Sequence, residues 1–176
     1  MIPFKQRVAV FQQLIAADKR THDPLADANI GGGRQAKVKR STIVQDAFDH
    51  LKGTKRALKR RVQVTFVSEQ GLEEVGIDGG GLFKEFMDCL CKAAFDVKFG
   101  LFAPTASQLL APNPDSIRSV VGEQHLEYFE FLGRILGKAM YERILIESRF
   151  AGVFLNVLLG RQNTLDDLWY LDEQVR

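Results

Sequence analysis

Four glycines fall within the six residues from Gly76 to Gly81, and no other stretch of the 176-residue chain constrains its fold so strongly. Glycine adopts backbone conformations that other residues avoid, and it lets the backbone approach another surface closely. An apolar run, Val62 to Val67, precedes the cluster, and a helix-patterned run, Leu82 to Ala94, follows it. The segment therefore predicts a strand, a constrained turn and the start of a helix.

The glycine cluster does not match a nucleotide-binding loop. It fits the opening of the pattern G-x-x-x-x-G-K-S/T, in which the Lys and the hydroxyl residue reach the phosphates and Mg²⁺. Leu82 and Phe83 stand at those positions, and Lys84 comes two residues late, a rotation of about 200° on a helix. The dinucleotide fingerprint fails as well, because its third glycine is missing. We expect a structural turn, in which Asp78 caps the next helix or accepts backbone N–H groups.

Composition and length place the chain among ordinary folded proteins of one domain, with 45% hydrophobic and 26% charged residues. Two cysteines are too few for a disulfide scaffold and fit a reducing compartment. The start of the chain lacks the apolar core of a secretory signal, and no apolar run approaches the roughly 20 residues that span a bilayer. We expect a cytoplasmic protein, with the nucleus as a second location.

Charge is divided unevenly along the chain. Residues 1–61 carry 14 Lys and Arg against 5 Asp and Glu, whereas residues 62–176 carry 10 against 17. A basic half raises the hypothesis of nucleic-acid binding. The densest basic stretch, Lys52 to Arg61, has helical spacing and no interleaved aromatic residue for base stacking. A solvated helix face is the favoured interpretation.

Helical periodicity dominates the rest of the chain. We expect an amphipathic helix from Phe4 to Arg20, a linker from His22 to Gln35, and a helix at 43–51 opened by a capping box of Thr42 and Gln45. Further helices are predicted at 82–94, 123–146 and 150–159, with another starting at Thr164. Alternation at 62–67 predicts a half-buried strand, and a short strand is expected at 109–110. The predicted fold class is α+β, predominantly α-helical with a few short strands.

Two of these helices carry features with open alternatives. The stripe of Phe4, Val8, Phe11 and Ile15 fits a membrane-surface face or a partner face, but docking against the same chain is favoured. In the 123–146 helix, glycines at 133 and 137 cost stability, which suggests that another element packs closely there.

No catalytic or metal-binding constellation emerges from the residues. Cys89 and Cys91 stand at i and i+2 of a helix, so their side chains point to different faces and cannot share an ion. The three histidines are far apart in sequence, which gives a zinc site no support. Both cysteines are interpreted as small packing residues. The acidic pairs at 73–74 and 166–167 are interpreted as solvated acids of a turn and a helix start.

Several blocks of the chain occur in an order and spacing that resemble one known family. They are Val62–Val67, Gly71–Phe86, Phe99–Phe102, Leu110–Pro114, Tyr128–Tyr141, Phe150–Gly160 and Leu165–Leu168. Together they resemble the early N-terminal lobe of the HECT-type E3 ubiquitin-protein ligase domain. The resemblance covers residues 37–176. We therefore expect an amphipathic helix with a Gly-rich linker at 1–36 and a partial HECT domain at 37–176.

The resemblance implies a ubiquitin-protein transferase. In this family the N-terminal lobe docks a ubiquitin-conjugating enzyme, and a cysteine on a second lobe takes ubiquitin as a thioester and passes it to a substrate lysine. No cofactor and no metal is implied, and the catalytic cysteine is expected beyond Arg176, which leaves no catalytic residue in this chain. The implied partners are the conjugating enzyme, ubiquitin and protein substrates. The alternative is a non-catalytic module that docks a partner through its N-terminal helix, and nucleic-acid binding by residues 34–61 comes third.

Overall fold

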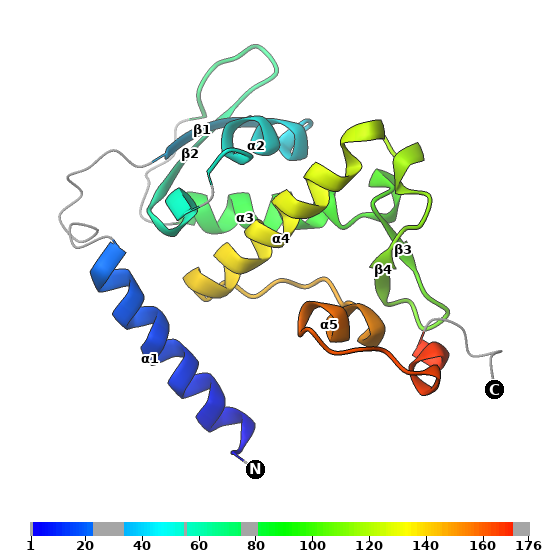
Figure 1. The fold of residues 1–176 in the computed structure, drawn as a ribbon. Helices are drawn as coiled ribbons and strands as arrows, with labels where there is room; N and C mark the ends of the chain where they lie inside the picture. Colours follow the sequence, from blue (N-terminus) through cyan, green and yellow to red (C-terminus); the bar gives the residue numbers. More distant parts are fainter. Residues whose placement is uncertain (1, 23–33, 55, 75–80, 171–176) are drawn as a thin grey trace.

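The computed structural model describes residues 2–22, 34–54, 56–74 and 81–170. The α-helices are α1 (Phe4–His22), α2 (Ile43–Leu51), α3 (Gly81–Ala94), α4 (His125–Glu142) and α5 (Gly152–Leu158). The strands are β1 (Arg34–Lys39), β2 (Val62–Val67), β3 (Phe102–Pro104) and β4 (Leu110–Pro112), and short 3₁₀ turns join several elements (Figure 1). The predicted class, α+β with few short strands, is confirmed.

Strands β1 and β2 form a parallel pair in which Arg34 aligns with Val62 and Lys39 with Val67. Helix α2 makes the crossover between them, as parallel strands require. The alternation expected for β2 is confirmed, because Val62, Val64 and Phe66 are buried. Strand β1 was not predicted, and it runs across the expected boundary between residues 36 and 37.

Helix α2 buries the stripe that its sequence predicts, and this stripe forms the centre of the core. The ring of Phe48 stacks on Tyr128 of α4 with centroids 3.8 Å apart, and Phe131 meets Phe48 edge-on. The predicted capping box is wrong. The Thr42 hydroxyl donates to Asp46 Oδ2 (2.9 Å), and the Gln45 side-chain oxygen accepts from the Tyr128 hydroxyl in the core.

The basic stretch after α2 is not one helix face, contrary to the favoured interpretation. Helix α2 ends at Leu51, a turn follows, and a separate 3₁₀ helix spans Arg56–Lys59. Lys59 pairs with Asp18 of α1 at 2.9 Å. Part of the basic charge is therefore paired with an acidic side chain of the same chain, which weakens the hypothesis of nucleic-acid binding.

Helix α4 is shorter than its predicted range. Its buried face includes Phe131, Leu132 and Ile135, whereas the apolar side chains of Leu126 and Met140, near its two ends, are exposed. The expected close packing at Gly133 and Gly137 is absent in the described part of the chain, because a Cβ added at either glycine would meet no atom within 4 Å.

Helix α1 ends two residues later than predicted. Its C-terminal end contacts the rest of the structure (Figure 1). Its stripe does not dock along its whole length. Ile15 is buried, but Phe4 is 70% exposed and Phe11 is 44% exposed. The expectation of docking against the same chain is therefore wrong for the N-terminal part of the stripe.

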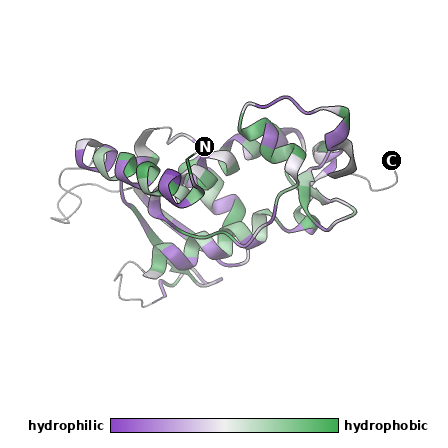
Figure 2. Ribbon diagram, turned by 90° about the horizontal axis from the view of Figure 1, so that it is seen from below, coloured by the Kyte–Doolittle hydropathy of each residue, from purple (hydrophilic) through white to green (hydrophobic). Residues whose placement is uncertain are grey.

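The β3–β4 hairpin and α5 lie at the opposite end of α4 from α1 (Figure 1). Leu110 of β4, inside the segment expected to hold a short strand, bridges to the residues before α5 through its N–H to Arg149 O and its C=O to Ala151 N (both 2.8 Å). In Figure 2, hydrophobic and hydrophilic residues alternate along the helices, as amphipathic packing around one core requires.

Candidate functional site

The two thiols lie on α3, which is part of the core. Cys91 is 4% exposed, and burial, with a smaller contribution from the charge of Asp88, raises the pKa of its thiol to about 12. Nucleophilic attack needs a thiolate, which such a group does not form near neutral pH. Cys89 is half-buried, with its Sγ 4.0 Å from Arg40 Nη1. The interpretation of Cys91 as a packing residue agrees with this geometry.

Glu73, Glu74 and Asp167 of the acidic pairs have structural partners. Glu73 pairs with Lys37 at 2.8 Å and Glu74 with Arg40 at 3.0 Å. Asp167 Oδ2 accepts from the backbone N–H of Thr164 at 2.8 Å, so it closes the turn that opens the last 3₁₀ helix, Leu165–Tyr170. Among the described residues, His, Cys, Asp and Glu side chains form no group that could hold a metal ion.

Arg40 connects the two sides of the glycine-rich segment. Its Nη2 contacts Glu74, before the segment, and Glu85, after it, at 3.0 and 2.8 Å. The guanidinium also lies over the Phe66 ring, 4.2 Å from its centroid. Hydrogen bonds to Glu74 and then Glu85 raise the pKa of Arg40 above its usual value. Asp78 and the glycines before Gly81 lie outside the described residues, so the expected turn and cap stay predictions.

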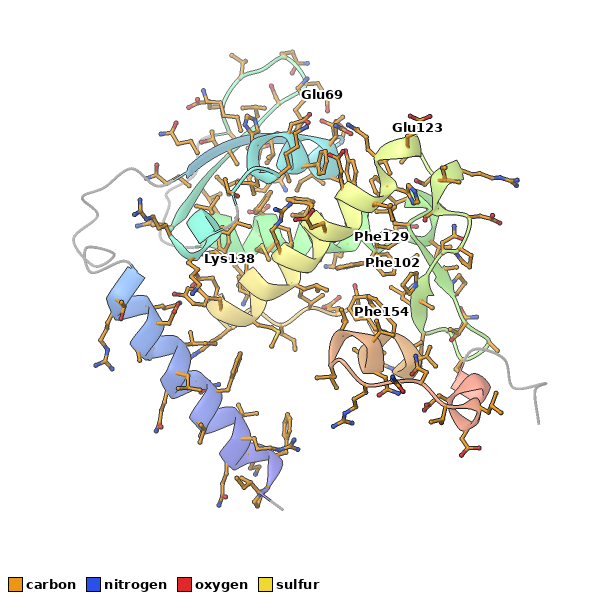
Figure 3. All side chains as sticks on the ribbon, in the orientation of Figure 1. Glu69, Phe102, Glu123, Phe129, Lys138 and Phe154 are labelled. Atoms are coloured by element: carbon orange, nitrogen blue, oxygen red, sulfur yellow. The ribbon has the colours of Figure 1, made fainter. Side chains whose placement is uncertain are left out.

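Aromatic side chains pack the hairpin, α4 and α5 into one aromatic unit. The ring of Phe102 on β3 lies 5.4 Å from Phe129 of α4 and 6.0 Å from Phe154 of α5 (Figure 3). Phe95, after α3, and Phe150, before α5, also pack on Phe102 at 5.2 and 5.8 Å. The edge-on pairs among them, which Phe102 makes with Phe95, Phe129 and Phe154, add roughly 0.5–1.5 kcal/mol each beyond the area that they bury.

A buried lysine lies at the other end of α4. Lys138 is 4% exposed, and its Nζ donates to Glu142 Oε1 at 2.6 Å and to the Arg60 carbonyl at 3.0 Å (Figure 3). Two hydrogen-bond acceptors, one of them charged, therefore stabilise the buried ammonium group. Sequence reasoning missed this site. The only signal in the sequence was that Lys138 falls on the side of α4 that faces the core.

One pair of side chains has the chemistry of a nucleophile and a base. The Ser116 hydroxyl lies 2.9 Å from His125 Nδ1, joining the 3₁₀ helix Ser116–Arg118 to the first residue of α4. Ser116 is buried, and within the described ranges no carboxylate hydrogen-bonds to His125. A hydrolytic site needs an accessible hydroxyl and an oriented base. This pair is a structural link between two elements.

Comparison with known proteins decides the family. A model of the HECT-domain (ubiquitin-transferase) family matches residues 88–176, about half of the chain. The chain belongs to the HECT family. The predicted resemblance is therefore confirmed, and the aromatic unit, α4 and α5 all lie within the matched HECT residues.

HECT relatives match almost the whole chain. E3 ubiquitin-protein ligase UPL6 of Arabidopsis thaliana is 42% identical over 176 residues, which is 99% of this chain. A probable E3 ubiquitin protein ligase of Schizosaccharomyces pombe is 39% identical over 97% of the chain. E3 ubiquitin-protein ligase etc-1 of Caenorhabditis elegans is 40% identical over 88%. The HECT chain spans only 17%, 16% and 16% of these relatives' own lengths.

The HECT chain has no helix in its described part that is both long and apolar enough to cross a membrane. The described residues contain one buried thiol and one half-buried thiol, and no group of side chains among them could hold a metal ion.

Proposed function

We propose that this chain is the early part of the N-terminal lobe of a HECT-type E3 ubiquitin-protein ligase. The whole protein accepts ubiquitin from a conjugating enzyme as a cysteine thioester and transfers it to a substrate lysine. This chain supplies the rigid scaffold, and the catalytic cysteine lies beyond Arg176. Membership of the HECT family and the short share of each relative that the chain spans support the proposal.

The observation that carries the scaffold role is the state of Cys91. Its thiol is enclosed by the core and its pKa is raised to about 12, so it is neither accessible nor ionised near neutral pH. Thioester formation needs a thiolate that can reach the activated carbonyl carbon of ubiquitin. The chain therefore holds the Cys91 thiol in a structural position.

A thioester-trapping assay tests this role. The 176-residue chain is mixed with activating enzyme, conjugating enzyme, ATP and ubiquitin, and then separated without reductant. We expect no reductant-sensitive adduct, and the same result for a C89S/C91A variant. The full-length protein serves as the positive control. A ubiquitin adduct that depends on Cys89 or Cys91 would contradict the scaffold role.

The second candidate function is a non-catalytic interaction module. The exposed side chains of Phe4 and Phe11 on α1 favour it, because an apolar stripe without a partner is typical of a docking helix. A partner captured by the chain and lost on F4A/F11A substitution would support this function. It does not exclude the first, since a lobe of a ligase can also dock partners.

The proposal also covers the partners of the whole protein, its location in the cell and the division of this chain into two parts. Partners are the conjugating enzyme, ubiquitin and protein substrates, acting through the whole domain, with no cofactor, no metal and no nucleic acid. We propose a cytoplasmic location, with the nucleus as the alternative. We also propose a division between the N-terminal helix and the partial HECT domain, set before Arg34 because β1 pairs with β2.

A further inference from the structure

Charged and polar side chains join the C-terminal end of α1 to the rest of the structure. Lys59 Nζ donates to both carboxylate oxygens of Asp18 at 2.9 Å, and the Tyr141 hydroxyl donates to Asp18 Oδ2 at 3.0 Å. Next to them, Lys19 Nζ donates to Glu142 Oε2 at 2.7 Å. These five side chains, from α1, the 3₁₀ helix after α2 and the end of α4, are called the clamp below.

One residue of the clamp, Glu142, is also hydrogen-bonded to a buried side chain of the rest of the structure. Glu142 accepts from Lys19 with one carboxylate oxygen and from the buried Lys138 with the other. Lys138 in turn donates to the Arg60 carbonyl, and its ammonium lies 5.5 Å from the centre of the Phe83 ring on α3. The rest of the structure therefore offers the Glu142 carboxylate as the acceptor for Lys19. It also offers Lys59 and Tyr141 as donors to Asp18.

Apolar packing contributes little to holding α1. Phe4, Val10, Phe11 and Leu14 are all exposed. Ile15 is buried, but it lies outside the main core cluster of the described residues. Most of the stability of a helix in a protein comes from its tertiary contacts, not from helix propensity. The helical state of α1 thus depends on contacts that are mostly electrostatic.

We propose that α1 is a releasable arm held by the clamp. The acidic and basic groups of the clamp are roughly one quarter to two fifths exposed, so dissolved salt screens them, whereas the apolar core is not weakened in this way. Ionic strength, or a partner that competes for these charges, then frees the arm together with its apolar stripe. This inference does not rest on ubiquitin transfer and concerns a conformational device within the chain.

Hydrogen exchange measured by mass spectrometry tests the clamp on the full 176-residue chain. Raising NaCl to about 1 M, where the Debye length falls to about 3 Å, should speed exchange of the α1 amides about two- to fivefold and leave the α3 amides unchanged. D18N and K19Q should produce the same increase at low salt. Both substitutions lie on α1 and leave the contact between Lys138 and Glu142 intact. D88N is the matched control, because it removes a surface ion pair with Lys92 within α3.

Three results would overturn the proposal. Protection of α1 that ignores both salt and D18N would show that other contacts hold the helix. Equal acceleration in α1 and α3 would show that the network stabilises the whole fold and does not hold a separate arm. Failure of the charge exchange D18K/K59D to restore protection lost in D18K, with α3 unchanged, would show that attraction between these two residues is not what docks α1.

Discussion

The stacked rings of Phe48 and Tyr128 show how single side chains connect α2 to α4. Both rings are at most 1% exposed, and their planes differ by only 11°. The hydroxyl of Tyr128 keeps a hydrogen-bond partner in the side chain of Gln45, so the polar end of the ring is satisfied within the core.

F48A should therefore lower the free energy of unfolding by about 3–5 kcal/mol, because it removes a large buried ring and leaves a cavity. Urea denaturation followed by circular dichroism measures the change. F4A is the matched control, since Phe4 is 70% exposed, and it should change stability by less than about 0.5 kcal/mol. Equal effects of the two substitutions would place the core elsewhere.

The two cysteines should differ in reactivity. With its pKa raised to about 12, the Cys91 thiol stays protonated at pH 8, and burial blocks access as well. Labelling with a thiol reagent should modify Cys89 first and leave Cys91 protected in the native protein. In denaturant both should react at similar rates. Rapid native labelling of Cys91, located by peptide mapping, would contradict the buried geometry.

At the scale of elements, the sequence predicted helices and strands that follow a local pattern. It missed those that depend on contacts between residues distant in sequence. The stripe of α2 follows a helical period without interruption, and the structure buries each of its members. Strand β1 was missed because its sequence, Arg-Gln-Ala-Lys-Val-Lys, has small apolar residues between long basic ones. Ala36 and Val38 are fully buried only because β2 and α2 cover them, which local composition does not reveal.

Helix α4 shows where periodicity alone is insufficient. Apolar residues occur on more than one side of this helix, and the aromatic contacts of Tyr128 and Phe131 with Phe48 mark the side that faces the core. Those contacts come from an element some eighty residues away in sequence. The buried Lys138 was equally hidden, because its acceptors are a carboxylate on the next turn and a carbonyl from another element.

The glycines of α4 lead to a stability prediction with a matched control. G137A should raise the free energy of unfolding of this chain by about 0.5–1 kcal/mol, because Gly137 is helical and a Cβ there meets only open space. G100A should lower it, because Gly100 has φ +86° and a Cβ would come within 2.8 Å of Ser119 Cβ. Thermal unfolding measures both. Destabilisation by G137A would show that this face is already occupied.

Acid should weaken the end of α4. Burial opposes ionisation of Glu142, but hydrogen bonds from Lys138 and Lys19 outweigh it and lower the pKa of this carboxyl below its usual value of 4.5. A carboxyl with a lowered native pKa contributes its full stabilisation above the unfolded pKa and loses it as pH falls through the native pKa. E142Q should therefore cost about 1–3 kcal/mol at pH 7, and the difference from the unsubstituted chain should shrink below about pH 4.5.

Urea titrations at several pH values measure how the stability difference between E142Q and the unsubstituted chain changes with pH. E127Q is the control, because Glu127 is exposed on the same helix. A difference between E142Q and the unsubstituted chain that stays constant down to acid pH would show that the charge of Glu142 is not what stabilises this region.

For the molecule as a whole, we propose that this HECT chain supports a catalytic thiol that lies beyond Arg176. The ordered sequence blocks predicted the family, and the family match and the relatives confirmed it. The residues alone could not show how the support is built. The Phe102 cluster, the Arg40 contacts and the clamp each join elements that are distant in sequence.

The most direct test is made in the full-length protein, by single-turnover loading of ubiquitin from a charged conjugating enzyme onto the C89S/C91A variant. We expect an unchanged rate and yield of the ubiquitin thioester, with thermal stability measured in parallel. Loss of thioester formation in a variant that remains folded would contradict this expectation, because one of these two thiols would then be the acceptor.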